Sequence, residues 1–458
     1  MPQKRRLSLG WMALVAGWAS LPTPAAACGG TFCDSGPTAM PVDQTGENIL
    51  FVLDGQNVEA HVQIQYSGSA ERFAWVVPMP EVPTVEVGSQ PLFANLLQAT
   101  VPSYGFSRQF DSCGSVGGTS GFGGAGGTSA GTGGAAGTGG VTGGPTVVFK
   151  KVVGAFEVTV LQGGTAQEVS TWLTDNAYQT IGSAPLILED YVAQNFVFVA
   201  IKLTGGAGVD EIHPLVFRYP GNEPCVPLKL TAVAAVEDMG VRTFFLGDDR
   251  VYPSPGYMHV ELNPVRLDWL QLGANYTQVV SRAADSAVAN GKAFITEFAG
   301  ASSRVSLGGV YDSLWNDAPF ATTAPEDVIT LLQSQNLVYC FATGPTTGSC
   351  QYSHPLIQPL LQQYLPAPTG VDESLFYADL VSYRTQINRA VWSAAGFAAD
   401  FKARIVDPGV HARDLLGRWP FLTRLFSTIS PAEMTVDPIF HARPDLSTAV
   451  GGTQQFST

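Results

Sequence analysis

The chain has 458 residues, a formal net charge of −14 and 45 % hydrophobic residues. The excess of acidic groups repels phosphate backbones, so the charge argues against nucleic acid and anionic lipid as partners. The hydrophobic content is sufficient for one large core or two.

The N-terminus has the three-part pattern of a secretory signal peptide. Basic residues at positions 4–6 precede an apolar stretch at 7–21, which is followed by three alanines at 25–27. The pattern predicts cleavage after Ala27 and a periplasmic or extracellular location. The apolar stretch is shorter than the ~20 residues that span a bilayer, and no later segment is apolar enough, so we expect no transmembrane segment in the mature chain. An alternative is a lipoprotein in which Cys28 carries the lipid.

The segment that follows has the pattern of a β-sheet. Hydrophobic and polar side chains alternate over 58–66, which predicts a half-buried strand with Glu59 and His61 on its solvent face. Flanking strands are expected at 49–53 and 73–77.

Residues 114–144 contain 16 glycines and no charged side chain. Such a segment cannot bury apolar surface, and it predicts a flexible insertion at the surface of one domain. The entropy of closing such a loop grows only logarithmically with its length, so the sheet can continue after it.

The sheet continues after this insertion, and most of the expected helices follow it. Strands are expected at 147–153, 156–161, 196–203, 216–219, 228–234, 241–246 and 257–262. Helices are expected from Ala166 behind the capping box Thr165/Glu168, over 276–290, from Pro325, over 373–405, and at the capping pattern Ser430–Glu433.

The order of these elements predicts an α+β fold, with a β-rich N-terminal part that contains an antiparallel sheet and a helical C-terminal part. The expected organisation is a signal peptide at 1–27, a β-rich domain at 28–300 that contains the insertion, a helical region at 301–445 packed on that domain, and a polar tail at 446–458.

Six cysteines remain after the predicted cleavage, and an even number in an oxidising compartment predicts three disulfides. Fifteen pairings are possible, and the short loops favour two of the bridges. The favoured set is Cys28–Cys33 and Cys340–Cys350, which leaves Cys113 for Cys225. The alternative, structural zinc, requires closely spaced pairs such as C-x-x-C, and the sequence has none.

Several strings of the sequence resemble one bacterial family. They include AHVQIQYSGSAERFAWVVPMP at 60–80, VDEIHPLVFRYPGNEPCVP at 209–227 and PAEMTVDP at 431–438. The family is domain of unknown function 2330, and the resemblance covers nearly all of the mature chain outside the insertion. It implies an exported bacterial protein, often in an envelope setting, and it brings no established activity, cofactor or catalytic residue.

Two predicted strands carry the side chains that are best suited to chemistry. His259 and Glu261 share one face of the strand at 257–262, as His61 does on its own strand. If the two strands adjoin, His61, His259 and Glu261 form a site of two histidines and one carboxylate that can bind a metal or transfer a proton. We interpret these side chains as solvent-facing residues of antiparallel strands, with the metal or acid/base site as the alternative.

Two further groups have a structural and a catalytic interpretation. The string Asp210-Glu211-x-His213 is interpreted as a cluster of salt bridges in a loop, because it matches no metal-binding spacing. Cys225 is interpreted as half of a disulfide, and the alternative is a nucleophile with His213 as its base.

The leading hypothesis is a non-enzymatic binding or structural module of the cell envelope, with no cofactor and with envelope components as candidate partners. The alternative is an exported hydrolase or metal-dependent enzyme that uses His61, His259 and Glu261. An enzyme should bury these side chains in a concave polar pocket, whereas a binding module should leave them on an open face.

Overall fold

The computed structural model describes residues 43–67, 74–107, 144–178, 184–205, 208, 211–233, 235–253, 256–446, 449–450 and 453–457. The predicted signal peptide, Cys28, Cys33, Cys113 and the glycine-rich insertion up to position 143 lie outside these residues. No helix within the described ranges is long and apolar enough to cross a membrane.

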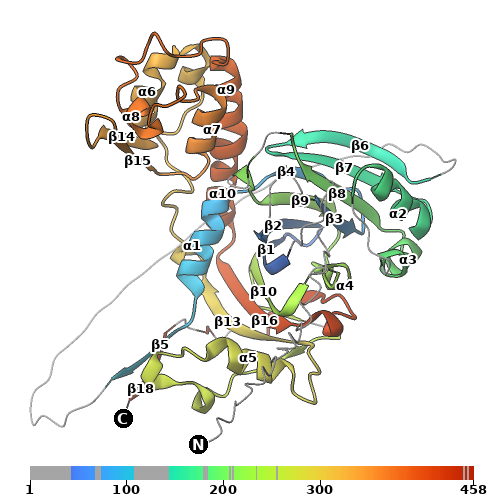
Figure 1. Cartoon of the computed structure of the whole chain (residues 1–458). Helices are drawn as coiled ribbons and strands as arrows, with labels where there is room; N and C mark the ends of the chain where they lie inside the picture. Colours follow the sequence, from blue (N-terminus) through green and yellow to red (C-terminus); the bar gives the residue numbers. More distant parts are fainter. Residues whose placement is uncertain are drawn as a thin grey trace, which may run out of the picture.

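An eight-stranded mixed sheet forms the centre of the molecule (Figure 1). In sheet order its strands are β12 (Met258–His259), β13 (Ala293–Ala301), β16 (Phe421–Ile429), β10 (Ala235–Gly247), β1 (Asp43–Leu53), β2 (Asn57–Ser67), β9 (Leu215–Pro220) and β4 (Thr84–Val87). β1 runs parallel to β10, and β12 runs parallel to β13, while the other neighbours are antiparallel.

A four-stranded antiparallel sheet packs on one face of the large sheet (Figure 1). Its strands are β3 (Ala74–Met79), β8 (Val197–Leu203), β7 (Phe156–Gln162) and β6 (Thr146–Val153). The main core lies between the two sheets, where Val58 and Val62 of β2 meet Trp75, Val158 and Val199 of the smaller sheet. Because side chains alternate along a strand, these inward residues leave the intervening residues of β2 to face the other way.

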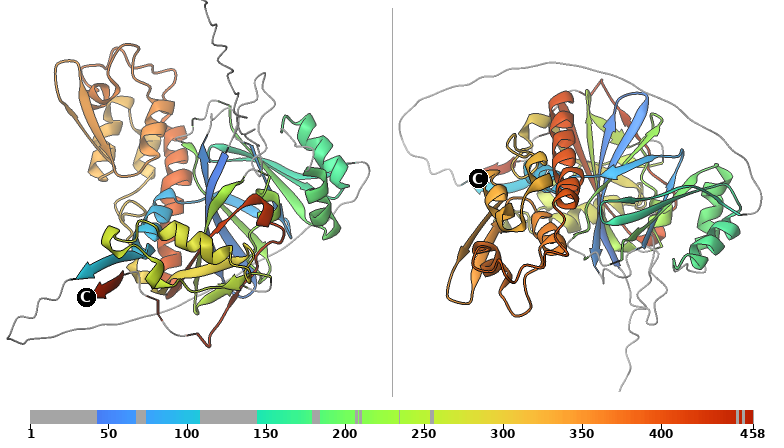
Figure 2. Two further views of the ribbon diagram at one scale, coloured as in Figure 1. Left: turned by 60° about the horizontal axis from the view of Figure 1, so that its bottom comes forward. Right: turned by 90° about the horizontal axis from the view of Figure 1, so that it is seen from above.

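Helices cover the outer face of the smaller sheet. They are α2 (Ala166–Asp175) and α3 (Ala184–Ala193), and they pack on it around Val169, Tyr191 and Phe198 (Figure 2). The predicted capping box at the start of α2 is present, since Thr165 and Glu168 bond reciprocally to each other's backbone.

The opposite face of the large sheet is also covered. Here α1 (Gln90–Thr100) and α10 (Asp407–Arg418) bury Leu50 of β1 against Phe93 and Ala412 (Figure 2). The face of β2 that carries Glu59 and His61 is therefore in the interior of the molecule, and this placement determines the candidate site described below.

Most residues between the strands β13 and β16 form a helical region with a core of its own. Its elements are η5 (Ser302–Arg304), η6 (Ala318–Thr322), η7 (Pro325–Asp327), α6 (Val328–Ser334), β14 (Val338–Ala342), β15 (Gly348–Tyr352), α7 (Ile357–Tyr364), α8 (Glu373–Ala378), α9 (Ala394–Phe401) and the π-helix η8 (Lys402–Val406). The predicted α+β class is confirmed, with helices mostly in the C-terminal part.

The remaining elements lie around the large sheet. They are α4 (Leu228–Thr231), α5 (Tyr276–Ala284), η3 (Pro264–Arg266), η4 (Trp269–Gln271), η9 (Pro431–Glu433) with its predicted capping box, and the two-stranded pairs β11 (Val251–Pro253) with β17 (Phe440–Ala442) and β5 (Ser103–Ser107) with β18 (Thr453–Ser457).

The prediction of a strand at 228–234 is wrong, because the segment begins with the short helix α4. Leu228 enters the core between the sheets and Leu230 enters the core under α2 and α3, so alternate apolar residues serve two cores. The backbone N–H of Lys229 donates to a carboxylate oxygen of Asp437 at 2.8 Å, so it is not available to a neighbouring strand.

The single helix predicted over 373–405 is also wrong. α8 ends at Ala378, turns follow, and a second helical run then extends from α9 through η8 to the end of α10. Pro408 cannot donate a backbone hydrogen bond, and the π-helix directly before it, in which Asp407 N–H bonds Lys402 O, accommodates this within a continuous run.

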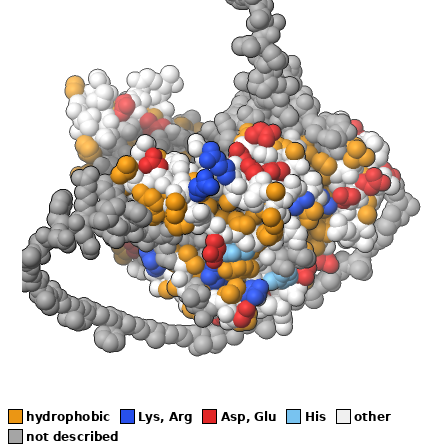
Figure 3. All heavy atoms as spheres, turned by 90° about the horizontal axis from the view of Figure 1, so that it is seen from below, with side chains coloured by type: hydrophobic (Ala, Val, Ile, Leu, Met, Phe, Trp, Pro, Cys, Tyr) orange, Lys and Arg blue, Asp and Glu red, His pale blue; other side chains and the backbone are white. Residues whose placement is uncertain are grey.

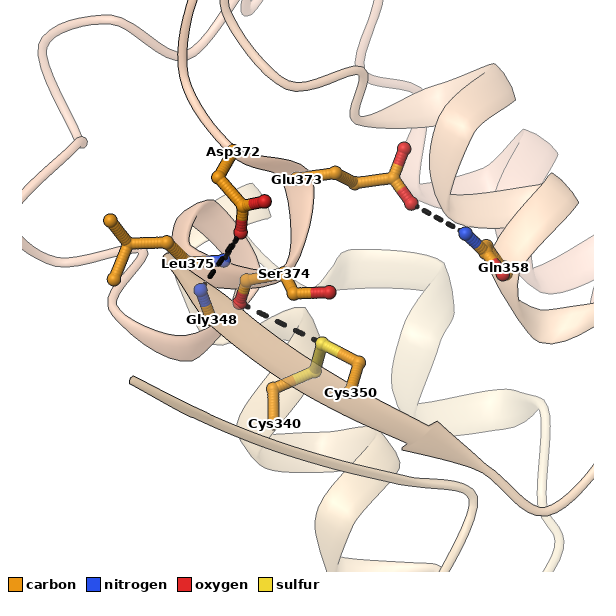
Figure 4. The surroundings of a disulfide bond; sticks show 8 residues. All are labelled: Cys340, Gly348, Cys350, Gln358, Asp372, Glu373, Ser374 and Leu375. Atoms are coloured by element: carbon orange, nitrogen blue, oxygen red, sulfur yellow. Dashed lines mark hydrogen bonds between the residues drawn. A yellow bond between two sulfur atoms is a disulfide. The ribbon is translucent and has the colours of Figure 1, made fainter. Parts of the chain in front are cut away.

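One of the three predicted disulfides lies within the described residues. Cys340 and Cys350 join β14 to β15 as directly opposed residues of the hairpin (Figure 4). Asp372 accepts backbone N–H groups from Gly348 at 2.9 Å and from Leu375 at 2.8 Å, so it caps α8 and ties it to the hairpin. Closing a loop of this length removes roughly 2–3 kcal/mol of unfolded-state entropy, so the bridge stabilises the helical region.

Candidate functional site

His61 does not face solvent. It lies on β2 with Glu59, on the face opposite Val58 and Val62, and only 1 % of it is exposed. α10, which comes more than 300 residues later, covers this face. The alternation along β2 correctly separates its two faces, but it carries no information about a distant helix that packs on the polar one.

His61 and His259 do not converge. β12, which carries His259, is separated from β2 by β13, β16, β10 and β1 in the large sheet. At about 4.8 Å per strand, the two histidines are more than ~20 Å apart. His259 and Glu261 do line one cavity together, but His61 has other partners.

The partners of His61 are Glu59 and His411. The Nε2 atom of His61 lies 2.6 Å from Oε1 of Glu59, and Nε2 of His411 lies 2.5 Å from the same oxygen. The two imidazole rings are parallel to within 2°, with centroids 5.7 Å apart. These three side chains present two nitrogens and one carboxylate oxygen within 4.8 Å of one another, which is a two-histidine, one-carboxylate ligand set.

An arginine of the neighbouring strand completes the group. Arg218 of β9 stands directly opposite Glu59, and its Nε donates to Oε2 of Glu59 at 2.7 Å. Its Nη1 donates to Glu86 of β4 at 2.5 Å, and its Nη2 lies 2.9 Å from Nε2 of His411. Two carboxylates and one guanidinium leave this group with an excess negative charge before either histidine is protonated.

The environment sets the protonation states of two of these side chains. Burial alone would raise the pKa of Glu59, but hydrogen bonds from His411 and His61 and their charges hold it well below its usual range. Burial lowers the pKa of His61, and this effect outweighs the nearby carboxylate. Near neutral pH the site therefore contains an ionised carboxylate and a neutral imidazole, which are the forms that coordinate metals.

The hydrogen bonds at His411 conflict with each other. Nε2 of His411 carries either a proton or a lone pair, yet it contacts both the carboxylate of Glu59 and an N–H donor of Arg218. One of the two contacts is therefore unfavourable. A cation placed between the two side chains would be bound by the lone pair of His411 and by the carboxylate of Glu59. Arg218 would keep Glu86 as its partner.

The site is open on one side. The side chain of His411 is 32 % exposed, whereas those of His61 and Glu59 are 2 % and 13 % exposed. The sequence signals the pair Glu59-x-His61, because residues two apart on a strand share a face. It gives no signal for His411, which lies on a helix that follows an irregular π-helical turn.

The other predicted groups have structural partners. Glu211 forms an ion pair with the buried Arg404 of η8 at 2.9 Å, while Asp210 lies outside the described residues. Both ring nitrogens of His213 contact backbone groups, at 3.1 Å to Ala155 N–H and at 2.8 Å to Pro214 O. His213 is therefore not available as a base for Cys225.

Cys225 is half-buried and lines the same cavity as Asp437. Burial, and then the charge of Asp437, raise its pKa, which opposes the thiolate form that a nucleophile requires. Cys225 forms no disulfide within the described residues, and Cys113 lies outside them, so their pairing stays a prediction.

Comparisons with known proteins place the chain at the family level. No curated protein is found to match it. A mutated baculovirus P35 after caspase cleavage is a solved structure with some similarity, at 12 % identity over 48 % of this chain and 77 % of that one, with a TM-score of 0.23. A family model described as an uncharacterized protein conserved in bacteria matches residues 22–311, which include Glu59 and His61 but not His411. The chain therefore belongs to the bacterial family of domain of unknown function 2330.

Proposed function

We propose that this protein is an exported metal-binding module of the bacterial cell envelope, in which Glu59, His61 and His411 bind one divalent transition-metal ion. The observation that carries the proposal is the convergence of three ligand atoms within 4.8 Å in a largely buried site. Two imidazole nitrogens and a carboxylate oxygen favour zinc and its neighbours over magnesium or calcium, which prefer all-oxygen sites.

The geometry needs only small adjustments to accept an ion. Ligand atoms about 2.1 Å from a tetrahedral zinc ion are ~3.4 Å from one another. The two nitrogens are now 2.6 and 2.5 Å from the carboxylate oxygen, so each contact must lengthen by less than ~1 Å. Side-chain rotations at the partly exposed His411 can supply most of this movement.

Two features support export. The basic, apolar and small-residue pattern at 1–27 is that of a signal peptide, and the Cys340–Cys350 disulfide is the kind of bridge that persists in an oxidising compartment. Envelope components remain the proposed partners, and the acidic charge argues against nucleic acid.

A second candidate function is hydrolysis at the same metal ion. The observation that favours it is the number of ligands: the described residues supply three, and the exposed edge at His411 leaves room for water as the fourth. Zinc lowers the pKa of a bound water to about 7, which generates a nucleophile at neutral pH.

Zinc titration of the chelator-stripped protein tests the metal site. We expect one equivalent to bind and His411→Ala to weaken binding by at least ~100-fold, because each lost ligand costs more than a lost outer partner. His441→Ala, on β17, is the matched control and should keep the affinity. Failure of the wild type to bind zinc, or equal affinities in wild type and His411→Ala, would contradict the proposal.

Ester, amide and phosphoester substrates offered to the zinc-loaded protein then separate binding from hydrolysis.

Cell fractionation tests export independently of the metal. We expect the full-length gene product to be recovered outside the cytoplasm with Cys28 as its first residue, because the peptidase cuts after Ala27. Replacement of the apolar stretch at 7–21 by polar residues should retain the precursor in the cytoplasm. An uncut precursor in the cytoplasm of unmodified cells would contradict export.

A further inference from the structure

The helical region contains a long segment without charged side chains. No Asp, Glu, Lys or Arg occurs between Asp327 and Asp372, although 14 % of the whole chain is charged and several would be expected here. His354, the histidine of this segment, is buried, and burial lowers its pKa to about 3, so it is neutral near neutral pH. By contrast, basic and acidic side chains lie among hydrophobic ones on the lower face of the molecule (Figure 3). A surface formed by this segment therefore presents no charge of its own to a ligand.

The hairpin of β14 and β15 belongs to this segment and has two different faces. Val338 and Cys340 of β14 point into the core of the helical region. Because side chains alternate along a strand, Tyr339 and Phe341 point the other way, and they are 61 % and 39 % exposed. The hairpin lies on the side of the helical region that is turned away from the two sheets (Figures 1 and 2). Its outer face is therefore open to a ligand.

The outer face of the hairpin carries an aromatic patch, which is formed by Tyr339 and Phe341. Among the residues that the structure describes, these two are the only aromatic ones whose side chains are exposed. Their ring centres are 5.6 Å apart. On β15, Gln351 stands directly opposite Tyr339, and Ser349 stands directly opposite Phe341. A protein that buries its other aromatic side chains and gathers the exposed ones at one place has the signature of an interaction site.

An open groove of about 570 Å³ begins at this patch. Its lining includes Tyr339 and Gln351 of the hairpin, together with Gln333 and Asn336 at the end of α6, and it contains no charged side chain among the described residues. The side-chain amides of Gln333, Asn336 and Gln351 form no hydrogen bond within the described part of the chain. Each amide has two N–H donors and a carbonyl acceptor, so the groove has donors and acceptors to share with a ligand.

These groups together match the surface of a neutral sugar. A pyranose ring has C–H groups on its flat faces, and these weakly positive hydrogens pack favourably on the negative face of an aromatic ring. Its hydroxyl groups both donate and accept hydrogen bonds, as the amides of the groove do. An ionic ligand would find no opposite charge in the groove, and a purely apolar ligand would cover the amides without replacing their hydrogen bonds to water.

We propose that the outer face of the β14/β15 hairpin and the adjoining groove bind a neutral oligosaccharide. Tyr339 and Phe341 stack on its sugar rings, and Gln351 bonds to its hydroxyl groups. The family match ends at residue 311, so this binding face belongs to a part of the chain outside that match. The proposal does not depend on the metal site, since the two share no residue.

Three neutral oligosaccharides are the probes: cellohexaose, N-acetylchitohexaose and maltohexaose, measured by calorimetry on the full mature chain. We expect saturable binding of at least one of them, with a Kd of about 1 mM or tighter. Hexagalacturonate, an anionic counterpart, should bind more weakly, because the groove has no cation for its carboxylates. Absence of binding by all three neutral probes, or tighter binding of hexagalacturonate than of any of them, would overturn the proposal.

Replacing the rings by aliphatic side chains tests the stacking role. Tyr339→Leu/Phe341→Leu keeps apolar bulk on the patch but removes both rings, and it should weaken the bound probe by at least ~10-fold. Tyr339→Phe keeps the ring and should retain the affinity. Leu314→Ala, at another exposed apolar side chain of the helical region, is the matched control and should leave the affinity unchanged. Because all these side chains are exposed, every variant should melt near the wild-type temperature. Equal affinities in the wild type and the double leucine variant would contradict stacking.

Sedimentation velocity separates glycan binding from contact between two copies of the chain. We expect the same oligomeric state in the wild type and in Tyr339→Leu/Phe341→Leu, because the aromatic patch is the glycan platform and not a subunit interface. A wild-type dimer that the double variant dissociates would assign the patch to self-association and overturn the proposal.

Discussion

Arg424→Leu is expected to lower the free energy of unfolding by about 3–5 kcal/mol, one of the largest effects of any single substitution in this protein. Arg424 and Glu297 form an ion pair whose side chains are only 3 % and 1 % exposed. Arg424 also donates to Thr100 of α1 at 3.2 Å. Removing the guanidinium leaves a buried carboxylate without its counterion, and desolvation of that charge dominates the cost.

The double variant Arg424→Leu/Glu297→Leu separates desolvation from packing. With both charges gone, stability should return to within about 2 kcal/mol of the wild type, because apolar groups can replace a buried pair at little cost. Urea unfolding measures all the variants, and Arg418→Leu, at an exposed arginine on α10, is the control with an effect of about 0.5 kcal/mol or less. An Arg424→Leu effect no larger than this control would show that the pair is not buried.

Acid is expected to destabilise the protein steeply between pH 6.5 and 4, through histidines that are buried in the neutral form. Burial lowers the pKa of His213 to about 4 and that of His354 to about 3. As the pH falls below 6.5, the unfolded chain binds protons that the folded chain does not, so stability falls with pH. His213 alone should contribute a loss of about 3 kcal/mol by pH 4.

The slope of stability against pH measures this effect. His213→Gln should reduce the slope by up to about 1.4 kcal/mol per pH unit between about pH 6 and 4.5, whatever the variant does to absolute stability. His213→Gln/His354→Gln should reduce it by about twice as much, which provides an internal check. A slope equal to that of the wild type in both variants would mean that these histidines take up protons in the folded state.

Sequence patterns correctly predicted the elements that depend only on residues close together in the chain. The alternation around His61 gave β2 and separated its two faces, and the Thr165/Glu168 capping box marked the start of α2. The same reasoning failed at 228–234, where alternate leucines enter two different cores instead of one face of a sheet. Periodicity reports that a side chain is buried, but not in which core it lies.

At the candidate site, too, sequence patterns do not record which elements pack together. Glu59 and His61 are two residues apart on one strand, so the sequence could pair them, whereas His411 reaches them only through tertiary packing of α10. His259 looked equivalent to His61 because both lie beside a carboxylate two residues away. The order of the strands determines which of the two histidines lies beside His411. That order depends on connections in the large sheet that no local pattern records.

The position of β16 has a consequence for how a newly made chain acquires its structure. This strand lies between β10 and β13 inside the large sheet, although it is the last of the eight to be synthesised. Until residues 421–429 arrive, both neighbours present unsatisfied edges that can recruit other polypeptides. We therefore expect a nascent or truncated chain that stops short of Phe421 to be a substrate for chaperones and proteases, because the sheet is complete only once its C-terminal strand is present.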